Sequence, residues 1–251
     1  MAASRSWFRG PQPQTISFEL PSPSRWRVLE KVNELEAQMD EYSGVCSYAC
    51  IKYRCQILGD RTQTSYVRIY KQIYHFGTEA DDPATRARQA VDWIPPELRA
   101  CKKMTDKGST VTPRLLGWRR DKQYRTGLVP GGFIVSLAWE ELPGIQLGDD
   151  YGADRFWELE REERDRVRKA FKNTLQKIES LGIQPAFAHA KNLVWHSSSD
   201  TLSVVGFREP ASIKRKPWSV RNFKMYGLVK VPKGSKWYEQ DWDGDTSTWE
   251  F

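Results

Sequence analysis

Four cysteines could ligate a metal, form disulfides or act as nucleophiles. Cys46, Cys50 and Cys55 lie close together in the chain, and Cys101 stands apart. No two of them have CxxC spacing, and no histidine lies nearby at the spacing of a zinc ligand. We therefore expect no metal site and no cofactor. The default interpretation is reduced thiols in a cytoplasmic protein, with a disulfide left open.

Two other features could carry chemistry. His189 lies between two alanines, and a structural role for this lone histidine is favoured over a catalytic one. The basic run Lys214-Arg215-Lys216 is interpreted as solvated surface. A weak nuclear signal or a phosphate-binding patch is the alternative interpretation of this run.

Composition limits the class of protein. The chain has 251 residues and a net charge of +7, from 39 basic and 32 acidic residues. This mild excess indicates a solvated surface, so we expect no nucleic-acid partner. Aromatic residues make up 12% of the chain, which excludes a wholly disordered protein. No apolar run approaches the ~20 residues of a membrane span, and no secretory signal is visible.

The first part of the chain predicts strands flanked by helices. Residues 1–22, rich in Pro, Ser and Gln, predict a flexible arm. Apolar residues then recur every three or four positions from Trp26 to Met39, which predicts an amphipathic helix with Ser24 as N-cap. Alternating apolar and polar residues predict strands at 46–57, 65–74, 113–120 and 131–139. Short helices are expected after Pro83 and around Leu98, Cys101 and Met104.

The second part of the chain predicts one long helix at 161–181. Its expected inner face comprises Val167, Phe171, Leu175, Ile178 and Leu181, and Gly182 ends it. Two short strands, at 192–196 and 202–207, follow before an irregular, Trp-rich tail. This order predicts an α+β protein: an N-terminal sheet lobe at 23–141 that includes the leading helix, and a mainly helical C-terminal lobe at 142–251.

This order, together with the phrases TPRLLGW and LVPGGFIV, resembles the two-lobed protein kinase-like fold. The resemblance is to small phosphotransferase-like proteins of filamentous fungi, in a family related to aminoglycoside phosphotransferases. It covers about residues 42 to 213. Two further segments resemble a catalytic loop and a metal-binding loop in which functional residues are replaced: GIQPAFAHAKNLVW and LSVVGFREP.

The resemblance assigns roles in the expected N-terminal lobe. It implies that Arg68 stands where the strand Lys should be, and that Glu97 is its ion-pair partner on helix C. Trp139 begins the segment Trp139-Glu140-Glu141, expected as a hinge between lobes or as a plain strand end. From the residues alone, two alternative interpretations stay open: Arg68 as a solvated surface residue, and Glu97 as a helix-capping residue.

The resemblance also assigns roles in the expected C-terminal lobe. Asn192 matches the metal-binding asparagine, whereas Phe187 and Gly206 replace the two acids that phosphoryl transfer needs. Phe207 follows Gly206 in the expected ligand-binding set. An ordinary core position for Phe187 is the alternative interpretation.

Three functions follow from these replacements. The first is a cleft repurposed for a hydrophobic small molecule, with a cyclase or isomerase reaction of fungal secondary metabolism. An example is a Diels-Alder ring closure, in which Arg68, Lys71 or His189 donates a hydrogen bond. The second is a pseudokinase scaffold without catalysis. The third is an atypical phosphotransferase. The sequence does not indicate an oligomeric state.

Overall fold

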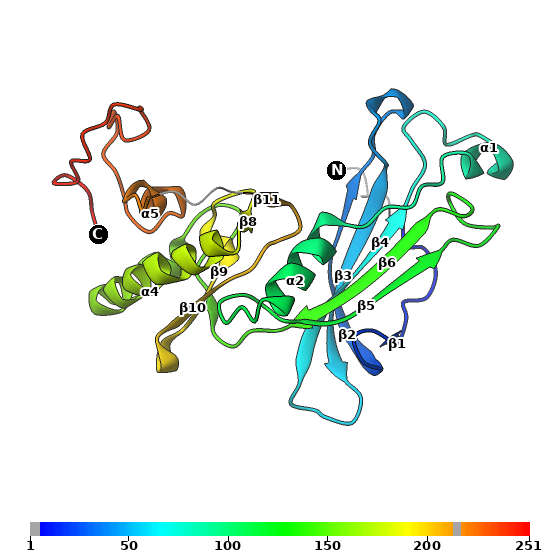
Figure 1. Cartoon of the computed structure of the whole chain (residues 1–251), viewed down its shortest axis with the longest axis horizontal. Coiled ribbons are helices and arrows are strands. Elements are labelled where there is room, and N and C mark those ends of the chain that lie inside the picture. The colour runs from blue at the N-terminus through cyan, green and yellow to red at the C-terminus, as the bar shows by residue number, and fades with distance from the viewer. Residues whose placement is uncertain (1–5, 213–216) are drawn as a thin grey trace. The chain divides into compact units, whose positions relative to one another are not determined.

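A computed structural model describes residues 6–212 and 217–251 (Figure 1). The chain is α+β and divides into two compact units, the first formed by residues 1–99 and 114–141, the second by residues 100–113 and 142–251. Compared with the expected lobes, the first unit also includes the described residues 6–22 but not residues 100–113. The basic run 214–216 lies outside the described residues.

The first unit is built on a six-stranded antiparallel sheet in the order β1-β2-β3-β4-β6-β5 (Figure 1). Its strands are β1 (Thr15–Phe18), β2 (Ser24–Ala37), β3 (Tyr48–Ile57), β4 (Thr64–Gln72), β5 (Leu115–Lys122) and β6 (Phe133–Glu140). Strands β3 to β6 confirm the predictions made from alternating residues, because successive side chains of a strand point to opposite faces of the sheet. The helices expected after Pro83 and around Leu98 are also present, as α1 (Pro83–Ala87) and α2 (Pro96–Asp106).

Both faces of this sheet are covered by apolar side chains. On one face, the rings of Tyr70 and Phe133 pack against Trp93, with Tyr70 and Trp93 centroids 5.9 Å apart. The opposite face carries a cluster that includes Ile16, Phe18, Trp26, Ile51, Tyr53 and Val67. Gly117 of β5 permits the close approach of β1, because a Cβ at this position would lie 2.7 Å from the Phe18 ring.

The helix expected between Trp26 and Met39 is wrong, because residues 24–37 form strand β2. Its register with β3 shifts between Val28 and Glu30 and again between Lys31 and Asn33, so Leu29 and Val32 are the extra residues of two bulges. Each bulge adds one residue to the period of two, which produces the spacing of three that resembles a helix. Ser24 is not an N-cap; its hydroxyl accepts a hydrogen bond from the Trp26 indole.

The flexible arm expected at residues 1–22 is also corrected for its described part. Residues 15–18 form β1, which pairs with β2, and Trp7 is buried. The backbone N–H of Trp7 donates to Glu34 at 2.6 Å, and the indole of Trp7 donates to Glu36. Burial of the Trp7 ring and hydrogen bonding of the arm to β2 outweigh its polar composition.

The second unit contains α4 (Arg161–Ser180), the long helix predicted from the sequence. Val167, Phe171, Leu175 and Ile178 on its expected inner face are buried. The other elements are α3 (Asp154–Trp157), α5 (Arg221–Met225), the sheet of β7 (Ile145–Gln146), β9 (Leu193–His196) and β10 (Thr201–Val204), and the pair β8 (Ile183–Pro185) and β11 (Pro210–Ser212). Short 3₁₀ turns occupy Glu41–Ser43 in the first unit, and Ala190–Asn192 and Ser197–Ser199 in the second.

The described part of the tail packs its aromatic side chains on α4. Tyr226 lies 4.8 Å from Phe171 between ring centroids, and Phe223 lies 5.8 Å from the same ring. Trp242 and Trp249 stack with their planes 3° apart. Several aromatic side chains of the Trp-rich tail therefore pack within the second unit.

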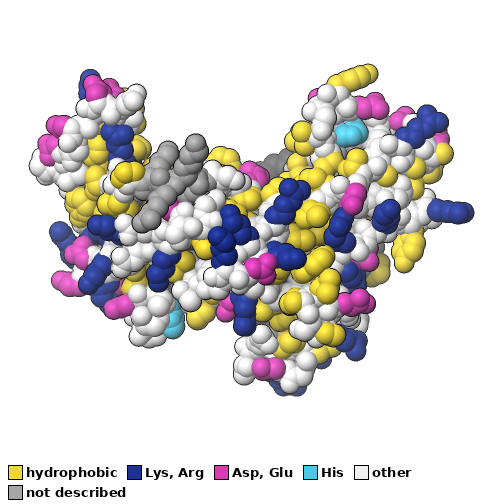
Figure 2. All heavy atoms as spheres, in the orientation of Figure 1, with side chains coloured by type: hydrophobic (Ala, Val, Ile, Leu, Met, Phe, Trp, Pro, Cys, Tyr) yellow, Lys and Arg dark blue, Asp and Glu magenta, His cyan; other side chains and the backbone are white. Residues whose placement is uncertain are grey.

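The face of the molecule in Figure 2 shows Lys and Arg side chains interspersed with Asp and Glu. This mixture agrees with the solvated surface expected from the mild net charge. Among residues 6–212 and 217–251, no helix is long and apolar enough to cross a membrane.

Candidate functional site

The candidate site in the first unit is organised by a buried ion pair between β4 and α2. Arg68 lies in β4, between β3 and β6, and its Nη1 donates to Oε1 of Glu97 at 2.5 Å. The hydroxyl of Tyr70 donates to the other carboxylate oxygen at 2.8 Å. Arg68 is 7% exposed and Glu97 is 4% exposed. The ion pair that the family resemblance implied is present, and the interpretation of Arg68 as a solvated surface residue is wrong.

Burial and the Glu97 charge shift the pKa values of the groups around this pair. Burial opposes the charge of Arg68, but the neighbouring Glu97 carboxylate outweighs it and raises the pKa of the guanidinium. Burial and the same carboxylate raise the pKa of Tyr70 well above its usual value. In contrast, Nε of Arg68 is buried without a hydrogen-bond partner among the described residues. The pair joins Glu97, in the first turn of α2, to β4 within the first unit. Removal of either partner would leave an uncompensated buried charge.

A second, more exposed network lies on the same face of the sheet. Nε of Arg54 donates to both carboxylate oxygens of Glu141 at 2.9 Å, and the hydroxyl of Tyr66 donates to Oε1 at 3.2 Å. Although burial acts in the opposite direction, hydrogen bonds from Thr64 and Arg54 lower the pKa of Glu141. Glu141, expected as part of a hinge or of a plain strand end, is therefore an acceptor within the first unit.

Lys52 and Trp139 complete this face. Lys52 pairs with Arg68 across β3 and β4, and its Nζ lies 4.7 Å from the centroid of the Tyr66 ring. The Arg68 guanidinium lies 5.2 Å from the centroid of the Trp139 ring. Burial, followed by repulsion from Arg68, lowers the pKa of Lys52. We call Lys52, Tyr66, Arg68, Glu97 and Trp139 the Arg68 face.

Lys52, Tyr66 and Tyr70 were missed by the sequence analysis. The signal that could have found them is the period of two, because Tyr66 and Tyr70 lie two residues on either side of Arg68. Lys52 needed the register of β3 against β4 in addition.

Lys71, proposed with Arg68 as a hydrogen-bond donor, lies on the opposite face of the sheet. Its Nζ donates to the backbone carbonyl of Trp7 at 2.6 Å and lies 4.5 Å from the centroid of the Phe8 ring. Residues three apart in a strand point to opposite faces, and the separate contacts of Arg68 and Lys71 show this separation. The structure does not bring these two donors together.

In the second unit, the structure brings Asn192 and Gly206 together. Nδ2 of Asn192 donates to the carbonyl of Phe187 at 2.9 Å, and the N–H of Val205 donates to the Asn192 carbonyl at 2.8 Å. Gly206 has a φ of +86°, and a Cβ at this position would lie 2.1 Å from Oδ1 of Asn192. The Asn192 side chain thus fills the space next to Gly206 and is hydrogen-bonded to the loop that carries Phe187.

The remaining predicted residues of the second unit differ in exposure. Phe187 is 62% exposed, so its interpretation as a core residue is wrong. His189 is also exposed. Phe207, expected to contact a ligand, is only 3% exposed, so its ring belongs to the core of this unit.

Cys46 and Cys55 lack the lowered pKa of an activated nucleophile. Cys46 and Cys55 carry free thiols, and burial raises the pKa of both, that of Cys55 to about 12. Among residues 6–212 and 217–251, no three His, Cys, Asp or Glu side chains are grouped so that they could hold a metal ion.

Comparison with known proteins gives a distant likeness to solved structures. No protein family model and no curated protein matches this sequence. Among solved structures, the chain is similar to the kinase PK-1 of the Cydia pomonella granulovirus, with 13% identity and a TM-score of 0.43. The match covers 75% of this chain and 53% of the viral kinase, so the chain spans about half the length of that protein. These findings do not support the fungal or aminoglycoside phosphotransferase assignment.

Proposed function

We propose that this chain is a small-molecule-binding protein of kinase-like fold that does not transfer phosphoryl groups. The observation that carries the proposal is the contact between Asn192 and Gly206. Phosphoryl transfer needs carboxylates that hold Mg²⁺ next to the phosphates. The side chain of Asn192 occupies the position into which a side chain at residue 206 would extend.

The Arg68 face supports a ligand with an apolar body and one anionic or carbonyl oxygen. Arg68 is committed to Glu97, whereas Lys52, Tyr66 and Trp139 are each partly exposed. The Tyr66 and Trp139 ring centroids are 6.1 Å apart and offer an aromatic surface. Lys52 forms no ion pair with any carboxylate of residues 6–212 or 217–251, so it can bind the oxygen. An apolar surface with a few placed polar groups is one feature of small-molecule sites.

The arrangement favours binding over ring closure. Of the donors considered for a cyclase, Arg68 is occupied by Glu97 and Lys71 lies on the opposite face of the sheet. The proposal therefore includes no cyclase reaction. A scaffold without a small-molecule ligand becomes one outcome of the test.

The first experiment measures the melting temperature with ATP and MgCl₂, and with ATP and EDTA. A ligand at 100 times its dissociation constant stabilises the folded state by about 2.7 kcal/mol. We expect no stabilisation that depends on the metal. A metal-dependent rise in melting temperature, together with transfer of labelled phosphate to any acceptor, would overturn the non-phosphorylating part of the proposal.

The second experiment titrates anilinonaphthalene sulfonate, an apolar aromatic probe with one anionic group. We expect Lys52→Met to weaken binding about tenfold, a change of about 1.4 kcal/mol. Lys122→Met is the matched control, because Lys122 is exposed at the end of β5, outside the Arg68 face. Equal affinities for the two variants and the unmodified chain would favour the scaffold.

A further inference from the structure

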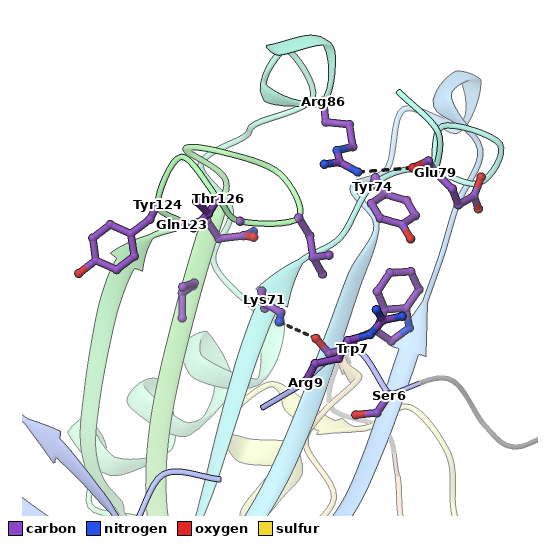
Figure 3. A pocket seen from close by; sticks show the side chains of 13 residues that line it. Ser6, Trp7, Arg9, Lys71, Tyr74, Glu79, Arg86, Gln123, Tyr124 and Thr126 are labelled. Carbon is purple, nitrogen blue, oxygen red and sulfur yellow. Dashed lines mark hydrogen bonds between the residues drawn. The ribbon is translucent and has the colours of Figure 1, made fainter. Parts of the chain in front are cut away.

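A pocket on the sheet face opposite Arg68 is not used by the proposed function. It lies within the first unit, with a volume of about 500 Å³, between the N-terminal arm, the segment after β4 and the hairpin that joins β5 to β6 (Figure 3). A cavity of this size accommodates a small organic ligand. Its lining comes from segments far apart in the sequence, at residues 6–9, 71–86 and 123–134.

The charge of the lining is unbalanced. Arg9, Lys71 and Arg86 line the pocket, and Glu79 is the acid that lines it with them. None of the three cations forms an ion pair with a carboxylate among the described residues. Residues 1–5 and 213–216, outside the described ranges, include no Asp or Glu and cannot supply the missing charge. Half-buried cations without such a partner, as Lys71 and Arg86 are, are unusual.

Lys71 and Arg86 are held in place by neutral groups. Lys71 donates to the Trp7 carbonyl, and Nη1 of Arg86 donates to the Glu79 carbonyl at 3.4 Å (Figure 3). The Arg86 guanidinium lies 5.6 Å from the centroid of the Tyr74 ring. Both side chains are therefore oriented while their charges stay unneutralised.

Glu34, an acid outside the lining, is already occupied by other groups. Glu34 acts on Lys71 only at longer range. It accepts hydrogen bonds from Ser6, from the backbone of Trp7 and from Lys31, and these interactions lower its pKa although burial opposes them. Burial, which outweighs the effect of Glu34, lowers the pKa of Lys71. An anionic ligand would supply the counter-charge that the chain itself lacks.

We propose that this pocket binds a small organic phosphate ester. A phosphate dianion matches the excess of cations, with the planar guanidinium of Arg86 as a bidentate donor and Lys71 as a point charge. The pocket is larger than one phosphate group requires, and Leu128 and Ile134 add apolar lining for the organic part. This site is independent of the Arg68 face, because it lies on the other side of the sheet.

The test is isothermal titration of the full chain with three probes: phenyl phosphate, inorganic phosphate and phenol. We expect phenyl phosphate to bind most tightly, because only this probe combines the charge with an apolar body. No saturable binding of phenyl phosphate at millimolar concentration would overturn the proposal. Equal affinities for phenyl phosphate and inorganic phosphate would overturn the assignment to an organic ester.

Three variants locate the site. We expect Arg86→Gln and Arg9→Gln each to weaken phenyl phosphate binding about tenfold, because each removes one cation from the lining. Arg9 is exposed, so its replacement leaves the fold intact and keeps the test valid if Arg86→Gln is unstable. Arg125→Gln removes the same charge from an exposed position in the same hairpin, outside the lining, and should leave the affinity unchanged. Equal losses in Arg125→Gln and Arg86→Gln, or no loss in either lining variant, would overturn the location.

Discussion

The buried pair between Arg68 and Glu97 makes a quantitative prediction about stability. Glu97→Gln removes the charge that compensates Arg68, while its amide oxygen can still accept the Tyr70 hydroxyl. Because Arg68 is 7% exposed, its charge would be left in a poorly solvated place. Removal of one partner from a buried pair costs about 3–5 kcal/mol. We expect the free energy of unfolding of the first unit to fall by this amount.

The double variant Arg68→Met/Glu97→Gln separates the cost of the unpaired charge from other effects. With both charges removed, no buried charge stays unpaired, so we expect more than half of the lost stability to return. The assay is urea denaturation followed by circular dichroism, with amide hydrogen exchange of β4 to report on the first unit alone. A loss below about 1 kcal/mol for Glu97→Gln, the range of exposed pairs, would refute the reasoning that this pair is desolvated.

Three further predictions concern Glu141, Gly206 and α4. Glu141 has a lowered pKa when folded, so its stabilisation is present above its unfolded pKa and is lost as the pH falls through the folded value; Glu141→Gln should flatten the acid limb of a plot of stability against pH, and an unchanged limb would contradict this. Gly206→Asp should destabilise more than Gly234→Asp, because both glycines have positive φ but only the first meets Asn192; equal melting temperatures would reject the contact. Leu175→Ala should cost about 2–5 kcal/mol in urea unfolding, and no loss would place this face in solvent.

The strands and the long helix were predictable from the spacing of their apolar side chains. Residues 65–74 alternate between two covered faces of the sheet, and α4 places Val167, Phe171 and Leu175 on one side. The period of their apolar residues therefore matches their geometry. Strand β2 was not predictable in this way, because two bulges change the local period of its apolar residues. Its strand conformation depends on pairing with β3.

The candidate site was predictable only in part. The pairing of Arg68 with Glu97 was implied by a family resemblance, and no spacing within either segment indicates it. Lys52 joins them through strand register, which depends on contacts between β3 and β4. The opposite pocket was missed, because Arg9, Lys71 and Arg86 meet only after the arm and the hairpin have folded onto the sheet.

The two bulges of β2 also affect whether strands of other copies of this chain can pair with its outer edge. β1 pairs with β2 only as far as Arg27, so along the described residues the outer edge of β2 continues without a further strand. Leu29 and Val32 are exposed at 44% and 42%, and on a regular edge such apolar side chains would favour pairing with a strand of another chain. A bulge interrupts the even spacing of N–H and C=O groups that a foreign strand needs for pairing. The two bulges that give β2 a helix-like spacing of apolar residues therefore also disfavour edge-to-edge aggregation of the sheet.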